Sequence, residues 1–113
     1  MKIKEIRKYL EGIAPLSLQE GYDNSGLLVG SEETECTGII TSLDVTEAVI
    51  KEAVAKNCNL IVAHHPVIFR GIKKLNGSNY VERTIIAAIK NDVAIYAIHT
   101  SLDNVLEGVN KKI

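Results

Sequence analysis

The three histidines of this 113-residue chain all lie where apolar segments end. His64 and His65 follow the apolar run 60–63, and His99 follows a second apolar run, four residues before Asp103. Neutral imidazole and carboxylate together form a common ligand set for zinc, iron and manganese. We therefore predict a metal site, with His64, His65 and Asp103 as the candidate ligands.

The spacing of these residues favours two ions over one. Successive side chains at a strand end point to opposite sides, so His64 and His65 are expected to bind different ions. Asp103 has two carboxylate oxygens and can bridge metals about 3.5–4 Å apart, the separation found in two-metal hydrolytic sites. The pattern predicts two divalent ions, zinc, iron or manganese, and hydrolysis as the reaction.

Neighbouring residues have competing interpretations. We expect His99 to orient a ligand or transfer a proton, as a catalytic residue, and direct ligation is the alternative. Thr46 is expected to cap the following helix, and so is Asp44, although ligation is open to Asp44 as well. Ser101 lacks a G-x-S-x-G elbow, which disfavours a serine triad. Without metal, His64 and His65 would simply end a strand as one buried and one solvated imidazole.

The elements that position these residues alternate along the chain. Apolar residues at helical spacing predict helices over about the first twelve residues, from Thr46 to near Asn57, and from Val81 to a break at Asn91. Short apolar runs predict strands at 27–29, 38–43, 60–63 and 93–98, and residues 105–113 resemble the start of another helix.

This order predicts an α/β fold, with a layered, mainly parallel sheet and helices on both faces. In such a sheet the segments after Leu43, Ala63 and Ile98 share one edge, which is where α/β proteins hold their sites. A plain α/β domain without a site would require these polar strand ends to be coincidental.

Composition excludes several function classes. The formal net charge is −1 with scattered Lys and Arg, which disfavours nucleic-acid binding. No apolar run approaches the roughly 20 residues that span a bilayer, so we expect no membrane association. Cys36 and Cys58 form no C-x-x-C pair, and the first residues lack a signal-peptide core. These features predict a cytoplasmic protein with free thiols.

Four sequence blocks carry a resemblance to a known family, at residues 22–30, 43–46, 61–69 and 97–104. In them the chain resembles the NGG-interacting-factor-three-like proteins, a dinuclear-metal-centre family often named type-two GTP cyclohydrolases. The resemblance implies that His64, His65 and Asp103 are metal ligands and that His99 lies beside the site. It also implies a similar α/β fold.

The resemblance further implies a metal-dependent hydrolase acting on a small molecule, such as a nucleotide or another small cyclic C–N substrate. The chain has no Gly-rich phosphate loop to support GTP itself. The alternative is a non-catalytic metal-binding scaffold or regulator that forms a ring-shaped homo-oligomer, such as a hexamer.

Family members continue beyond this length, and a C-terminal His followed four residues later by Glu completes their centre. This sequence has neither, so we expect residues 1–113 to form a single α/β domain, the N-terminal part of a longer chain, with an incomplete metal site.

Overall fold

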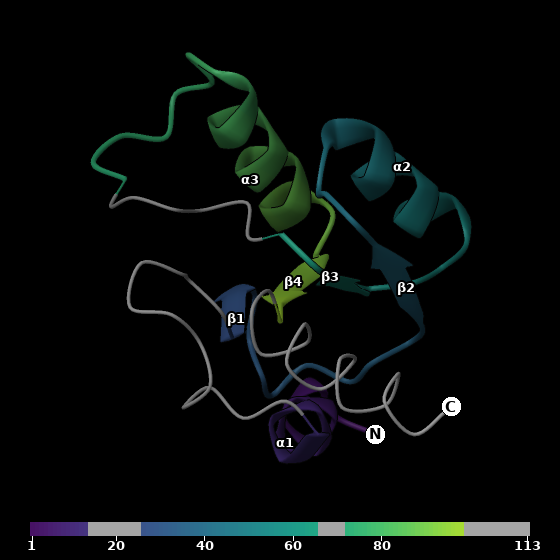
Figure 1. Ribbon diagram of the computed structural model, residues 1–113. Coiled ribbons are helices and arrows are strands. Elements are labelled where there is room, and N and C mark those ends of the chain that lie inside the picture. The colour runs from purple at the N-terminus through teal and green to yellow at the C-terminus, as the bar shows by residue number, and fades with distance from the viewer. Residues whose placement is uncertain (14–25, 66–71, 99–113) are drawn as a thin grey trace, which may run out of the picture.

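The computed structural model describes residues 1–13, 26–65 and 72–98, which form a sheet with helices on either side (Figure 1). Each helix and strand expected within these residues is present, and the helix expected at 105–113 lies outside them. The elements, in chain order, are α1 (Ile3–Ile13), β1 (Gly26–Val29), β2 (Ile39–Ser42), α2 (Glu47–Ala55), β3 (Leu60–Ala63), α3 (Tyr80–Lys90) and β4 (Ala94–Ala97).

The sheet has the strand order β1-β4-β3-β2. Strands β2, β3 and β4 are parallel, whereas β1 pairs with β4 in the antiparallel direction. The expected mainly parallel sheet is therefore confirmed, with β1 as its antiparallel edge. In the parallel part Ser42 pairs with Ala63, and Ala63 pairs with Ala97. The carboxyl ends of the three parallel strands are thus level with one another.

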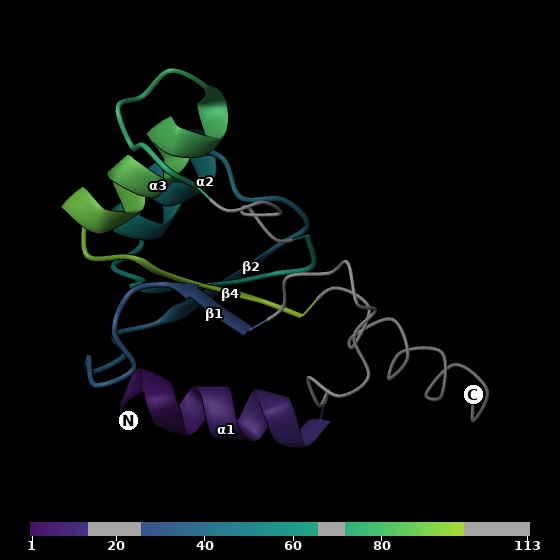
Figure 2. The ribbon, with the colours of Figure 1, turned by 90° about the vertical axis from the view of Figure 1, so that its left-hand side faces the viewer.

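Both faces of the sheet are covered, by α2 and α3 on one side and by α1 on the other (Figure 2). Ile61 and Ala63 belong to the core shared with α2 and α3, whereas Leu60 and Val62 belong to the core shared with α1. This alternation explains why β3 is apolar at every position, because a strand covered on both faces has no side chain that reaches water.

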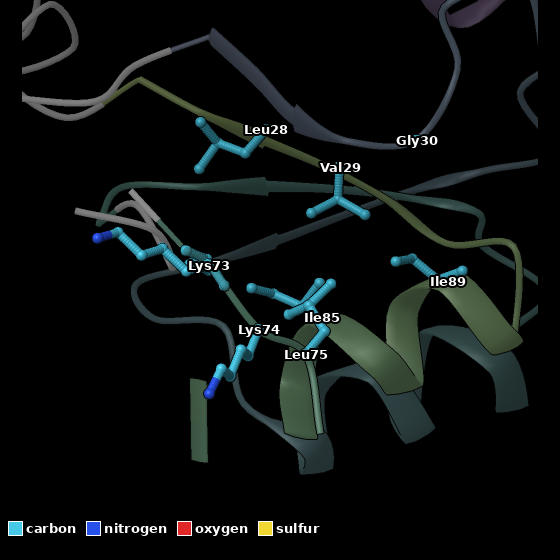
Figure 3. A pocket seen from close by; sticks show the side chains of 9 residues that line it. Leu28, Val29, Gly30, Lys73, Lys74, Leu75, Ile85 and Ile89 are labelled. Atoms are coloured by element: carbon cyan, nitrogen blue, oxygen red, sulfur yellow. The ribbon is translucent and has the colours of Figure 1, made fainter. Parts of the chain in front are cut away.

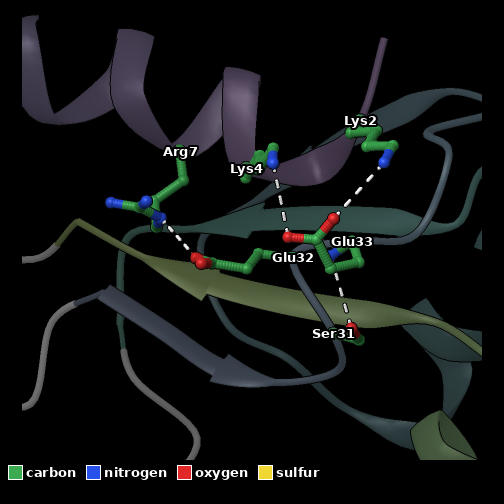
Figure 4. A network of polar contacts seen from close by, with 6 residues as sticks. All are labelled: Lys2, Lys4, Arg7, Ser31, Glu32 and Glu33. Atoms are coloured by element: carbon green, nitrogen blue, oxygen red, sulfur yellow. Dashed lines mark hydrogen bonds and ion pairs between the residues drawn. The ribbon is translucent and has the colours of Figure 1, made fainter.

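Helix α1 is held by the loop that follows β1 (Figure 4). The backbone N–H of Lys4 donates to the Glu32 carbonyl at 2.8 Å, which satisfies one of the donors left unpaired in a first helical turn. Arg7 Nε lies 2.7 Å from a Glu32 carboxylate oxygen, and Lys2 and Lys4 both reach the Glu33 carboxylate. Hydrogen bonds from Lys2 and Lys4, in that order, and the positive charges of both lysines lower the pKa of the Glu33 carboxyl. The acidic loop therefore serves to attach α1.

Side-chain caps begin the two helices of the opposite face. Thr46 Oγ1 accepts the backbone N–H of Val49 at 3.3 Å, and Asn79 Oδ1 accepts that of Glu82 at 2.9 Å. The backbone N–H of Asn76 donates to the Glu82 carboxylate and lowers its pKa. In the described ranges no helix is long and apolar enough to cross a bilayer.

Candidate metal centre

His64 and His65 lie directly after β3, at the carboxyl edge of the parallel strands. Their backbone N–H groups donate to consecutive carbonyls of the neighbouring segment, His64 to Ser42 at 3.0 Å and His65 to Leu43 at 2.9 Å. Hydrogen bonds between the two segments thus continue past the end of the paired strands. They fix where the two histidines leave the sheet.

The two imidazole rings are in contact. Their centroids are 4.8 Å apart with planes tilted by 55°, and both residues are half-buried. The expectation that they point to opposite sides is wrong, because the strand ends at Ala63 and its alternation does not extend to the bend at His64 and His65. The rings are close enough to hold one ion together or two neighbouring ions.

Asp44 has a different role from the one its sequence position suggested. Thr46 is the N-cap of α2, as predicted, so the additional capping expected of Asp44 is wrong. The Asp44 carboxylate oxygen Oδ1 instead lies 2.7 Å from Nδ1 of His65. A carboxylate only accepts hydrogen bonds, so Nδ1 of His65 carries the hydrogen and Nε2 of a neutral ring carries the lone pair. Sequence reasoning missed this contact, although it had placed Asp44 and His65 at the same edge.

The remaining predicted site residues, His99 and Asp103, lie outside the described residues. The residue before His99 does belong to the described part: Ile98 donates its backbone N–H to the carbonyl of Ala63 at 3.0 Å. The end of β4 is therefore tied to the residue that precedes the histidine pair.

The donor chemistry of the described residues fits a metal ion only in part. Two imidazoles beside a carboxylate are donors that zinc, iron and manganese accept. Within residues 1–13, 26–65 and 72–98, however, no three His, Cys, Asp or Glu side chains are grouped so as to hold one ion. His64 and His65 can supply two ligands, and a complete site needs donors from elsewhere.

A separate hollow of about 520 Å³ lies between β1, α3 and the segment 72–75 (Figure 3). Val29, Leu75 and Ile85 contribute apolar walls, and Lys73 and Lys74 extend from the end opposite Ile89. Its described lining includes no His, Cys, Asp or Glu, so this hollow does not supply metal ligands.

The two cysteines are free thiols, as expected. Cys36 Sγ lies 3.6 Å from the Gly38 carbonyl, and Cys58 Sγ lies 3.6 Å from the Lys56 carbonyl. Both contacts are local, and neither thiol belongs to the histidine pair.

Comparison with known proteins identifies a family and similar sequences. A sequence model of the family described as Duf34/NIF3 (NGG1p interacting factor 3) matches residues 1–113. A Clostridium acetobutylicum protein named GTP cyclohydrolase 1 type 2 homolog is 42% identical over 110 residues, which are 97% of this chain and 41% of that protein. This chain thus spans about two fifths of the length of that relative.

Solved structures agree with the sequence match. The crystal structure of a Staphylococcus aureus hypothetical protein superposes with a TM-score of 0.87 at 42% identity, over 91% of this chain and 34% of that one. A Bacillus cereus protein related to NIF3 gives a TM-score of 0.86 at 37% identity, over 91% of this chain and 28% of the other. The α/β fold described above is therefore shared with solved relatives.

Proposed function

The chain belongs to the Duf34/NIF3 (NGG1p interacting factor 3) family, and from this membership we propose that it is the ligand-bearing part of a metal-dependent hydrolase. His64 and His65 are two of its metal ligands, and Asp103 is the third from this chain. The substrate class is a nucleotide or another small cyclic C–N compound, in keeping with relatives named GTP cyclohydrolase 1 type 2 homologs.

One observation carries the proposal: the two imidazoles of His64 and His65 lie in contact at the carboxyl edge of the parallel strands. Two adjacent half-buried imidazoles add little to the packing of the apolar core. Side by side, however, they place ring nitrogens that can ligate a metal close to one another. This edge is also where open α/β sheets bind their ligands.

Each residue then has a chemical task. His64 and His65 would hold the ions through ring nitrogens, and Asp103 would hold them through its carboxylate. His99 would hold or move a proton during the reaction. When bound, two divalent ions supply Lewis acidity and lower the pKa of a water molecule towards neutrality.

The test combines metal content with turnover. The parent chain, His64→Ala and His65→Ala are dialysed with Zn²⁺ or Mn²⁺, and the metal per chain is measured by elemental analysis. We expect metal in the parent and a loss in both variants. Tyr80→Ala is the matched control, because it removes an exposed ring from α3. Equal metal content in all four proteins would refute the ligand assignment. Conversion of GTP by the metal-loaded proteins tests the hydrolase assignment.

A second candidate is a non-catalytic scaffold or regulator that forms a homo-oligomeric ring. The observation that favours it is exposed apolar surface along the β2 edge and α2, where Ile39 is 47% exposed, Leu43 61% and Val54 47%. Such residues can serve subunit contacts. Metal binding without conversion of GTP, together with a metal-dependent change of oligomeric state in light scattering, would favour this candidate.

A further inference from the structure

Asp44 and His65 meet across the ends of two neighbouring strands. Asp44 Oδ1 and His65 Nδ1 are 2.7 Å apart, a distance typical of a hydrogen bond strengthened by charge. Both residues are held by backbone contacts: Ser42 Oγ donates to the carbonyl of Asp44, and the N–H of His65 donates to the carbonyl of Leu43. The side-chain contact therefore joins two anchored segments.

This contact contributes little to stability. The Asp44 side chain is 63% exposed and that of His65 is 39% exposed, and ion pairs in such positions typically contribute about 0–1 kcal/mol. The start of α2 does not need the carboxylate either, because Thr46 caps it. The main physical effect of Asp44 is on the imidazole of His65, whose ring plane and tautomer it sets.

We propose that Asp44 is a positioning residue for a metal bound by His65, an inference that rests on the proposed function. By accepting the Nδ1 hydrogen, its carboxylate would hold the ring plane of His65 and leave Nε2 as the nitrogen that can ligate an ion. Among the described residues, Asp44 does not form a group of three metal donors with His64 and His65. Its proposed role is therefore to position His65, and not to ligate the metal itself.

The first measurement is made without metal. Nitrogen NMR of the ring atoms reports the tautomer of His65, whose signals are assigned by their loss in His65→Ala. We expect the parent chain to hold the hydrogen on Nδ1. In Asp44→Ala the ring loses its acceptor, and we expect a shift toward the Nε2–H form that predominates in an unconstrained histidine side chain. A merely structural role for Asp44 would leave the tautomer unchanged.

The second measurement is Zn²⁺ affinity by competition with a chelator. Loss of an acceptor behind a ligating histidine typically lowers metal affinity about 10–100-fold, and we expect such a fall in Asp44→Ala, whereas Asp44→Asn keeps an acceptor oxygen and should lose less affinity. Asp92→Asn is the matched control, since it removes one negative charge at the turn between α3 and β4, at the opposite end of the strands. Circular dichroism establishes that each variant is folded.

The outcomes separate this inference from the proposed function. Unchanged Zn²⁺ binding in His65→Ala would overturn both. Lost binding in His65→Ala, with parental affinity and tautomer in Asp44→Ala, would overturn the positioning role alone. An equal fall in Asp92→Asn would assign the effect to net charge and would also overturn it.

Discussion

The buried side chain of Tyr96 allows a quantitative prediction about the free energy of unfolding. It lies on β4 between the sheet and α1 and is 1% exposed, and the described residues provide no hydrogen-bond partner for its hydroxyl. Burial raises the pKa of this phenol from 10.0 to about 12. An unpaired buried hydroxyl costs about 1–3 kcal/mol. Tyr96→Phe should therefore increase the free energy of unfolding near neutral pH by about 1 kcal/mol, the low end, because the missing oxygen also forfeits packing contacts.

The same residue predicts how stability falls at high pH. Between pH 10 and about 12 the unfolded chain loses the phenolic proton while the folded chain of the parent keeps it. The unfolded state then binds fewer protons, so stability decreases as pH rises through this window. The loss from Tyr96 is about 1.4 kcal/mol at about pH 11 and approaches about 2.7 kcal/mol above the folded pKa. Tyr96→Phe lacks this loss, so its advantage over the parent should widen with pH.

The assay is urea unfolding followed by circular dichroism at several pH values, with phenolate absorbance as a direct measure of the titration. Tyr80→Phe is the matched control, because Tyr80 is 63% exposed and its loss should leave the pH dependence unchanged. Lysines titrate in every variant and cancel in the comparison. Parallel curves for the parent and Tyr96→Phe would refute the buried, unpaired hydroxyl, as would a marked destabilisation by Tyr96→Phe near neutral pH.

Three further predictions concern the backbone, a helix cap and the candidate site. Gly30→Ala should lower the free energy of unfolding by about 2–5 kcal/mol, because φ is +104° and an added Cβ would lie 2.7 Å from Cβ of Ala94. Urea unfolding measures this, and a loss below about 1 kcal/mol would contradict the close approach. Thr46→Ala should cost about 1 kcal/mol through the lost N-cap, and unchanged thermal unfolding would show that another group caps α2. Asp103→Asn should lose metal with the fold intact, whereas His99→Gln should keep metal and lower any hydrolytic rate about 10²–10⁴-fold. Added Mn²⁺ should therefore raise the Tm of the parent and His99→Gln only, and equal shifts in all three would exclude Asp103 as a ligand.

The elements of the fold were predictable because burial imposes a period on the sequence. The unbroken apolar run of β3 reflects cover on both faces, and the helical spacing of Ile50 and Ala53 reflects one buried side of α2. Val54 shares this helical spacing but is 47% exposed, so periodicity alone overestimates the width of the buried face.

The position of β1 could not be read from the sequence. Its pairing with β4 joins Leu27 to Tyr96, which are far apart along the chain, and neither local propensity nor connection length specifies that contact. The antiparallel direction of β1 could not be read from the sequence either. It depends on tertiary contacts, such as those between α1 and the loop that follows Val29.

For the candidate site, sequence reasoning placed Asp44, His64 and His65 at one edge, and the structure confirms that placement. It failed on the capping role of Asp44 and on the orientation of the two histidines. Thr46 caps α2 as predicted, but the sequence also allowed Asp44 this role because Asp and Thr are both good helix caps. Alternation likewise failed at His64, because it holds only inside a strand.

The register of the parallel strands determines where the candidate metal ligands lie relative to one another. The candidate donors His64 and His65 follow β3, and the carboxylate of Asp44 follows β2. Directly after β4, Ile98 donates its backbone N–H to the carbonyl of Ala63. The spacing of these residues therefore depends on the pairing of the three parallel strands, which forms only in the folded state, so metal binding and folding of this sheet must favour each other. The ion pairs that attach α1 lie beside the loop 31–36, at the opposite end of these strands, where Asn59 contacts the Glu35 carbonyl. Changes there should loosen α1 first, because they remove contacts that lie away from the hydrogen bonds at the histidine edge.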